Sequence, residues 1–140
     1  MQLLIAAAVI AVVSGVFCLS PVHGAEPKPA ITNLDATAWI CEARMTATIS
    51  GPADPVTVWF FWGTEDGDTS AVLWQHATND LYQVPGDASA HVGGLLPGTS
   101  YCFRVCAQNG GGKTWSDPVW FHTKTLFPIK SQVGTVVTVK

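Results

Sequence analysis

The most constraining feature of this chain is a turn that leads into an alternating strand, over residues 94–109. The stretch opens with Leu-Leu-Pro-Gly-Thr-Ser, and a Pro-Gly pair is a strong turn signal. Apolar side chains then recur at every second position, which predicts a strand with one face in a hydrophobic core. The core positions are Tyr101, Phe103, Val105 and Ala107, and the outward positions are Cys102, Arg104, Cys106 and Gln108.

This segment resembles strand F of a fibronectin type III domain and the turn before it, which read roughly L-x-P-x-T-x-Y-x-x-x-V-x-A-x-N. The positions in register are Leu95, Pro97, Thr99, Tyr101, Val105, Ala107 and Asn109. The resemblance implies a tyrosine corner, in which the ring of Tyr101 is buried at the sandwich edge and its hydroxyl bonds upstream backbone. It gives a structural role to Leu95, Pro97, Tyr101, Phe103 and Val105.

Two flanking segments extend the resemblance. Residues 112–123 resemble the F–G loop and strand G, which often read S-x-P-V-x-F-x-T. Residues 56–68 (VTVWFFWGTEDGD) resemble strand C and the following loop of such modules in large bacterial surface proteins. The match covers about residues 31–125 and implies a single antiparallel immunoglobulin-like β-sandwich.

The rest of the chain body agrees with an all-β fold. Strands are expected over residues 32–40, 43–49, 56–62, 72–76 and 88–92, separated by Gly and Pro. Short strands with turn signals between them are typical of an antiparallel sandwich. No stretch after the N-terminal apolar run has helical periodicity, and no internal repeat is visible, so one module is expected.

The N-terminal 25 residues have the character of a targeting segment. Leu3 to Leu19 is an uncharged apolar run, and small residues follow Pro21 where a signal peptidase would cut. The run lacks a preceding cation, and it is slightly short for a membrane span. We expect residues 1–25 to be a cleaved secretory signal, with an uncleaved membrane anchor as the alternative. Both place the domain in a secreted or cell-surface protein, with residues 26–30 as a stiff linker and residues 126–140 as a tail that could add a strand.

Three cysteines remain in the body, an odd number. Cys102 and Cys106 share one strand face about 13 Å apart, so they cannot bond to each other. An odd count in an exported protein suggests a free thiol or an intermolecular bridge, so Cys41, Cys102 and Cys106 are candidate intermolecular thiols. The alternative is that they are small apolar fillers under a covering element.

Composition and spacing argue against several functions. Net charge is −3 with no basic run, which argues against nucleic-acid binding. His76, His91 and His122 lie on different predicted elements without metal-ligand spacing, and no nucleophile elbow or oxyanion-hole signature accompanies Ser116 and Asp117. The acidic stretch over residues 64–69 could hold calcium, but it lacks a complete calcium-loop pattern, so a solvated hairpin loop is expected. The chain is therefore predicted to be a non-enzyme without metal or cofactor.

Strand parity instead gathers an aromatic face. With the core face fixed as above, the outer face of strands C, F and G collects Trp59, Phe61, Arg104, Trp120 and His122. Arg104 is expected between aromatic rings in a cation–π arrangement. An exposed apolar patch of this kind usually marks an interface. The alternative is that the valine-rich tail covers it.

The sequence thus predicts an adhesion or assembly module that binds another protein, or a copy of itself, through this face. Two alternatives stay open. The chain could be a structural subunit of an extracellular filament, whose tail adds a strand to a neighbouring sheet. It could also be a carbohydrate-binding module, with Trp59 and Trp120 stacking on sugar rings. Membrane contact is expected only if the leader is not cleaved.

Overall fold

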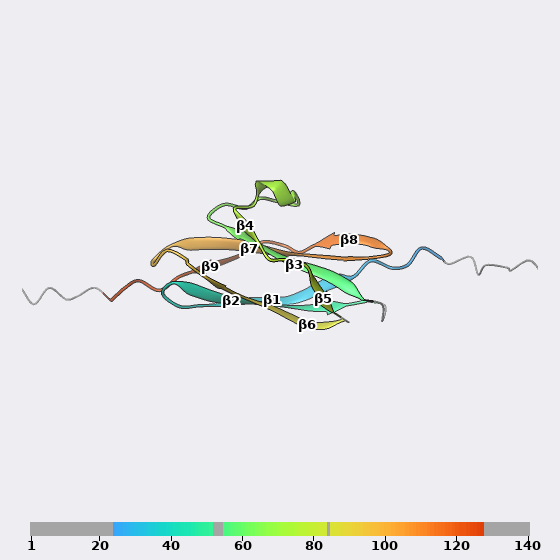
Figure 1. Ribbon diagram of the computed structural model, residues 1–140, viewed down its shortest axis with the longest axis horizontal. Helices are drawn as coiled ribbons and strands as arrows, with labels where there is room; N and C mark the ends of the chain where they lie inside the picture. The colour runs from blue at the N-terminus through green and yellow to red at the C-terminus, as the bar shows by residue number, and fades with distance from the viewer. Residues whose placement is uncertain (1–23, 52–54, 84, 128–140) are drawn as a thin grey trace, which may run out of the picture.

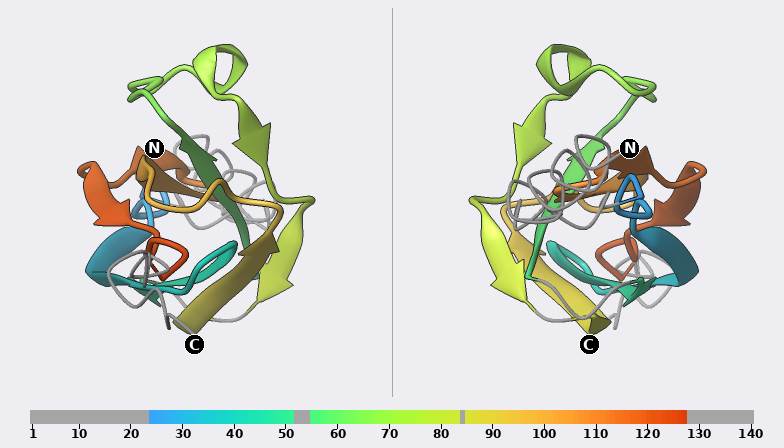
Figure 2. Two further views of the ribbon diagram at one scale, coloured as in Figure 1. Left: turned by 90° about the vertical axis from the view of Figure 1, so that its left-hand side faces the viewer. Right: turned by 90° about the vertical axis from the view of Figure 1, so that its right-hand side faces the viewer.

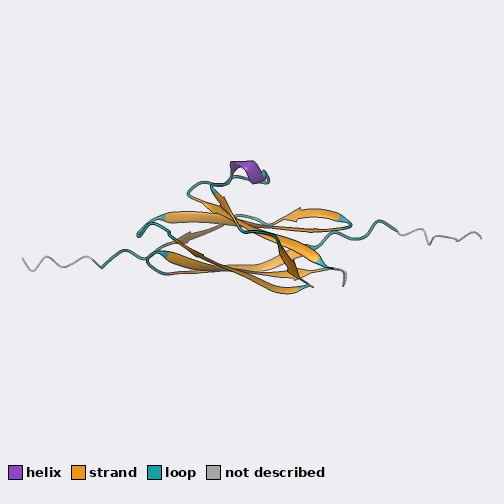
Figure 3. Ribbon diagram, in the orientation of Figure 1, coloured by secondary structure: helices purple, strands orange, loops and turns teal. Residues whose placement is uncertain are grey.

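The computed structural model describes residues 24–51, 55–83 and 85–127. The predicted leader before Gly24 and the tail after Phe127 lie outside the described residues. The described chain forms two antiparallel sheets that face each other, seen edge-on in Figure 1 and by secondary structure in Figure 3. This is the all-β sandwich that the sequence predicts.

One sheet has the strand order β1-β2-β6. The other has the order β4-β3-β7-β8, with β5 also pairing with β3 and β9 with β7. The strands are β1 (Ala30–Ala38), β2 (Glu42–Ser50), β3 (Val56–Gly63), β4 (His76–Ala77), β5 (Leu81–Gln83), β6 (Gly86–Gly93), β7 (Ser100–Asn109), β8 (Gly112–Trp115) and β9 (Val119–His122). A single 3₁₀ turn, η1 (Ala71–Leu73), lies between β3 and β4 in the described residues.

The hydrophobic core lies between the two sheets, which Figure 2 shows end-on. Each long strand contributes alternate residues to it because successive side chains of a strand point to opposite faces. Phe60 and Phe103 are fully buried and stack with ring centroids 6.4 Å apart. The predicted core positions Tyr101, Val105 and Ala107 of β7 are buried as well. So are alternate residues of the two expected strands that form β2 and β3: Ala43, Met45, Ala47, Ile49, Val56 and Val58.

The tyrosine corner is present. The backbone N–H of Leu96 donates to the hydroxyl of Tyr101 at 3.0 Å, across the turn that contains Gly98 at φ +60°. The fully buried Thr123 hydroxyl donates to the Leu96 carbonyl at 2.6 Å and accepts from the N–H of Thr99 at 2.9 Å. These bonds hold the β6–β7 connection against the end of β9.

The segment between β3 and β5 departs from the prediction. A strand is expected over residues 72–76, but the structure has the turn η1 there, and only His76 and Ala77 pair with β3. The Val72 and Leu73 side chains are exposed and only Trp74 is buried, so this stretch does not bury alternate side chains as a strand against a core would. Instead the N–H of Leu73 donates to the Ser70 carbonyl at 3.1 Å.

Residues 26–29, predicted as a linker, lie against the β7–β8 turn. Pro29 is fully buried, and the Asn109 side-chain amide donates to the Pro27 carbonyl at 2.8 Å. A side chain at Gly111 would collide with the Glu26 backbone, so this glycine permits the close approach. The chain enters the sandwich at this end and leaves at the opposite end (Figure 1).

Candidate binding face

The outer face of the sheet built on β3 and β7 has the predicted register. Phe61 pairs with Arg104, Trp59 with Cys106, and Cys102 with Trp120. All these side chains point away from the inter-sheet core, since their neighbours on each strand fill it. The predicted aromatic residues therefore lie on the outer face of this sheet, as the strand register required.

Most of this face is covered rather than exposed. The covering loop, which we define as residues 64–78, rises above the sheet in Figure 1 and places Trp74 on Phe61, with ring centroids 6.4 Å apart. Trp115 of β8 closes the other side of Phe61 at 4.9 Å. Phe61 and Trp74 retain only 7% and 8% exposure. The expectation of an open patch is thus wrong for Phe61, since Trp74 and Trp115 lie against it; the tail that was predicted as its alternative cover lies outside the described residues.

An ion pair fastens the covering loop to β7. Arg104 donates from Nε to Asp66 Oδ1 at 2.8 Å and from Nη2 to Asp66 Oδ2 at 2.7 Å. Its Nη1 donates to the Ser116 carbonyl at 2.9 Å. The hydrogen bonds from Arg104 hold the pKa of Asp66 below its usual value, and the same bonds raise the pKa of Arg104.

The predicted cation–π role of Arg104 is wrong, because its guanidinium forms a bidentate ion pair with the Asp66 carboxylate. Among the described residues, Lys113 is a cation that lies over an aromatic ring, with its Nζ 5.6 Å from the Trp59 ring centroid. The acidic stretch predicted as a solvated loop is likewise engaged, with Asp66 paired to Arg104. The positive charge of Arg104 on β7 explains why the acidic stretch lies there. The spacing of the two residues in the sequence did not indicate that Asp66 and Arg104 would pair.

The base of the covering loop is packed closely. A side-chain carbon at Gly67 would lie 2.7 Å from the Trp74 ring, so the indole rests directly on the glycine backbone. The Trp74 Nε1 donates to the Asp68 carbonyl at 3.1 Å, and the Gln75 side-chain oxygen accepts from the N–H of Thr64 at 2.9 Å. The tip of the loop is left in solvent, with Val72 88% and Leu73 67% exposed.

The two cysteines of β7 share one buried cluster with Phe61 and Trp74, and Trp59 and Trp115 pack against that cluster. Cys102 is 0% and Cys106 is 1% exposed, and burial raises the pKa of each thiol to about 11. Both therefore match the filler alternative, and their predicted availability for intermolecular bonds is contradicted by burial. Cys41 is exposed, and all three are free thiols.

The five predicted binding residues are therefore divided. Phe61 and Arg104 belong to the covered layer, and Trp59 is half-buried with its Nε1 donating to Asp80 at 2.6 Å. Trp120 is 55% exposed, and His122 is exposed with its Nδ1 3.0 Å from the Ser100 hydroxyl oxygen. Two predicted residues, Trp120 and His122, are thus exposed on this side of the molecule. The exposed apolar tip of the covering loop, Val72 and Leu73, was not singled out from the sequence.

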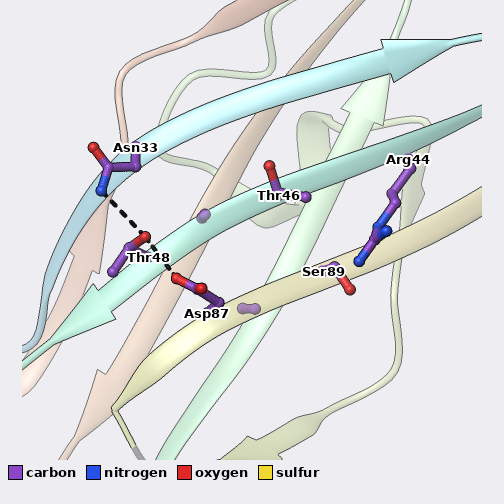
Figure 4. Close-up of a pocket in the computed structure, with 8 residues that line it drawn as sticks. Asn33, Arg44, Thr46, Thr48, Asp87 and Ser89 are labelled. Carbon is purple, nitrogen blue, oxygen red and sulfur yellow. Dashed lines mark hydrogen bonds between the residues drawn. The ribbon is translucent and has the colours of Figure 1, made fainter.

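The opposite sheet presents a polar outer face (Figure 4). Side chains of β1, β2 and β6 line a shallow hollow of about 380 Å³ there. The Asn33 amide donates to the Thr48 hydroxyl at 3.3 Å, and that hydroxyl donates to Asp87 at 2.9 Å. The labelled lining residues are Asn33, Arg44, Thr46, Thr48, Asp87 and Ser89.

Among the described residues, no group of three or more His, Cys, Asp or Glu side chains is arranged to hold a metal ion. Nor does the described part of the chain contain a helix long and apolar enough to cross a membrane.

Comparison with known proteins places this geometry in context. The model of the fibronectin type III domain matches residues 49–122, more than half of the chain. The solution structure of the sensor domain of the anti-sigma factor RsgI4 from Pseudobacteroides cellulosolvens is similar at 16% identity and a TM-score of 0.53, over 80% of this chain and 86% of that one. A fibronectin type III domain derived from the human KIAA0970 protein aligns at 15% identity and a TM-score of 0.44, over 70% and 75% of the two chains. At these identities the likeness concerns the fold alone. None of the curated proteins matches the chain.

Proposed function

Because the chain belongs to the fibronectin type III family, whose members are generally non-catalytic binding modules, we propose that it is an extracytoplasmic protein-binding module. In this proposal the leader, residues 1–25, exports the domain. The domain then contacts its partner through the outer side of the sheet built on β3 and β7. The contact is made by the tip of the covering loop, with Trp120 as a second exposed element.

The observation that carries the proposal is the contrast between the tip of the covering loop and its base. Val72 and Leu73 are 88% and 67% exposed, whereas the next residue, Trp74, is 8% exposed. An aliphatic pair held out on a well-anchored base is suited to insertion into an apolar pocket of a partner. Such an element loses little conformational freedom on binding, which favours affinity.

Trp120 extends the same side of the molecule. It pairs across the sheet with Cys102, which pairs in turn with Gly63, the residue before the covering loop begins. Trp120 therefore shares a row of the sheet with the base of the loop. Exposed tryptophans are frequent energetic centres of protein interfaces.

The carbohydrate alternative has less support. Stacking on sugar rings calls for two open indole faces, at Trp59 and Trp120. Trp59 is half-buried, its Nε1 is bonded to Asp80, and Lys113 lies over its ring. Of these two tryptophans only Trp120 offers an open indole, so protein binding is the better-supported function.

A site-specific photocrosslink tests the proposal. A photoreactive amino acid is placed at Leu73, or at Ser89 on the polar face as the matched control, and each protein is irradiated on its native host cells. We expect a discrete protein adduct from position 73 that the position 89 protein does not give. Mass spectrometry identifies the adduct, and a mass of two chains would identify the partner as a second copy. Equal adduct patterns from both positions, or no adduct from position 73, would refute the proposed face.

A further inference from the structure

An apolar groove lies at the end of the sandwich from which the chain leaves. It has a volume of about 750 Å³, and its walls come from the β1–β2 turn, the β6–β7 connection and the segment after β9. Trp39, Ile40 and Cys41 form one side, Gly93 and Gly94 another, and Phe127 lies at the exit. This end lies on the left in Figure 1.

The groove is preformed because its walls are joined by backbone hydrogen bonds. The N–H of Leu95 donates to the Cys41 carbonyl at 2.9 Å, which ties the β6–β7 connection to the β1–β2 turn. The N–H of Lys124 donates to the Trp39 carbonyl at 2.9 Å, which ties the exit segment to the same turn. The turn itself is closed by the N–H of Trp39 and the Glu42 carbonyl at 2.8 Å.

The apolar surface at this end is more extensive than packing within the described residues explains. Phe127 is 85%, Leu126 is 64% and Trp39 is 39% exposed. Contiguous exposed apolar surface marks a site that another segment or molecule occupies. The remaining question is which segment that is.

We propose that the occupant is the C-terminal segment of the same chain, residues 128–140, turned back onto the groove. The segment continues directly from Phe127, and it carries Val133, Val136, Val137 and Val139 with no acidic residue. Phe61, in the aromatic face that the tail was predicted to cover, is already closed by Trp74 and Trp115, so this part of the face does not compete for the tail.

The tail of the same chain is favoured over the tail of a second copy because it is covalently attached beside the groove. A segment tethered at the groove has an effective concentration in the millimolar range, far above that of a free chain at micromolar concentration. The chain's own tail therefore fills the groove before a neighbour's tail does. This inference concerns a different surface from the proposed partner face, so either can fail alone.

The groove contains its own reporter. Cys41 lines it and is exposed, whereas Cys102 and Cys106 are buried under the covering loop. Under native conditions a maleimide should therefore react at Cys41, and intact mass with peptide mapping locates the label. The rate of that reaction measures how much of the time the groove is covered.

The experiment compares labelling rates at Cys41 in three proteins. These are the full chain, a variant lacking residues 128–140, and the full-length double variant Val136→Asp/Val137→Asp. We expect both changes to raise the rate by about tenfold, equivalent to about 1.4 kcal/mol of docking free energy. Ser131→Asp, a polar change in the same tail, is the matched control and should leave the rate unchanged.

Two results would overturn the proposal. One is equal labelling of the full chain and the deletion variant, which would show that the tail does not cover the groove. The other is protection of the full chain that disappears on dilution, which would assign the groove to the tail of a second copy. Protection that is independent of concentration and lost in both tail variants is the result we expect.

Discussion

The two outer faces of this sandwich follow the same parity rule and end in opposite states. The face of β1, β2 and β6 carries polar side chains such as Arg44, Thr46 and Ser89 and remains open to solvent (Figure 4). The face of β3 and β7 carries Phe61 and two cysteines and is buried under the covering loop. The alternation of side chains along each strand determines which residues face outward. Where those residues are polar the face stays open to solvent, and where they are apolar another part of the chain covers it.

The comparison also shows how the cover is held in place. Hydrophobic contact alone does not fix the position of a loop, because it is not directional. Here Trp74 makes the apolar contact with Phe61, and the two directional hydrogen bonds between Arg104 and Asp66 fix the position of the loop. The covered face is thereby a small second core outside the main one, and the loop tip above it is exposed.

The largest expected effect comes from removing the indole of the covering loop. Trp74→Ala should destabilise the domain by about 3–5 kcal/mol, because it deletes a buried aromatic side chain and leaves a cavity over Phe61. The matched change on the open face, Thr46→Ala, should cost at most about 0.5 kcal/mol. Urea denaturation of both variants measures the difference. Similar losses for the two would remove the distinction between the faces.

Breaking the ion pair should have a smaller effect that depends on pH. Asp66→Asn should cost about 1–3 kcal/mol at pH 7, toward the lower end because the Asp66 side chain keeps 28% exposure. The pKa of Asp66 is lowered in the folded state, so its contribution is fully present above the unfolded value of about 3.9 and is lost as pH falls through the folded value. Denaturation from pH 7 to pH 2 should show the two proteins converging at the acid end. A gap that stays constant with pH would mean that the pair does not fasten the loop.

The corner tyrosine serves as a reference outside both faces. Tyr101→Phe keeps the ring and removes only the acceptor of the Leu96 N–H, so it should cost about 1–2 kcal/mol. Chemical denaturation measures this loss, which should be independent of the state of the covering loop. Nearly complete additivity with Trp74→Ala is therefore expected. Strong non-additivity would show that the second core and the main fold are not separate.

The smallest effect on stability belongs to the loop tip. Val72→Ser together with Leu73→Ser should change stability by no more than about 0.5 kcal/mol, since both side chains are exposed. Partner crosslinking from a photoreactive residue at Trp120 should nevertheless be lost in this variant. Retained crosslinking would place the partner elsewhere on the molecule.

The sequence was sufficient to predict the structure where the pattern lies within one short stretch of the chain. The Pro97–Gly98 turn and the alternation after Tyr101 predict the corner, the β7 register and the core positions, and all are confirmed. Strand pairing then transfers the register to β3 and β9. Each of these inferences needs only the period of two along a strand.

The sequence was insufficient where contacts join distant residues. Nothing in the spacing of Asp66 and Arg104, 38 residues apart, indicates their pairing. The strand predicted over residues 72–76 does not form, because the loop is held mainly by the Trp74 side chain and the Asp66–Arg104 ion pair rather than by a repeating buried face. The same reasoning explains why the exposed tip was missed, since exposure of Val72 and Leu73 follows from how the base is fixed.

The accessibility of the buried thiols tests the covered face most directly. Under native conditions at pH 8, maleimide should label Cys41 and leave Cys102 and Cys106 unmodified, as their burial and raised pKa of about 11 require. In Trp74→Ala, still folded by circular dichroism, both β7 cysteines should become labelled, because the cover over them is lost. Labelling of Cys102 and Cys106 in the unaltered protein at the rate of Cys41 would contradict the account.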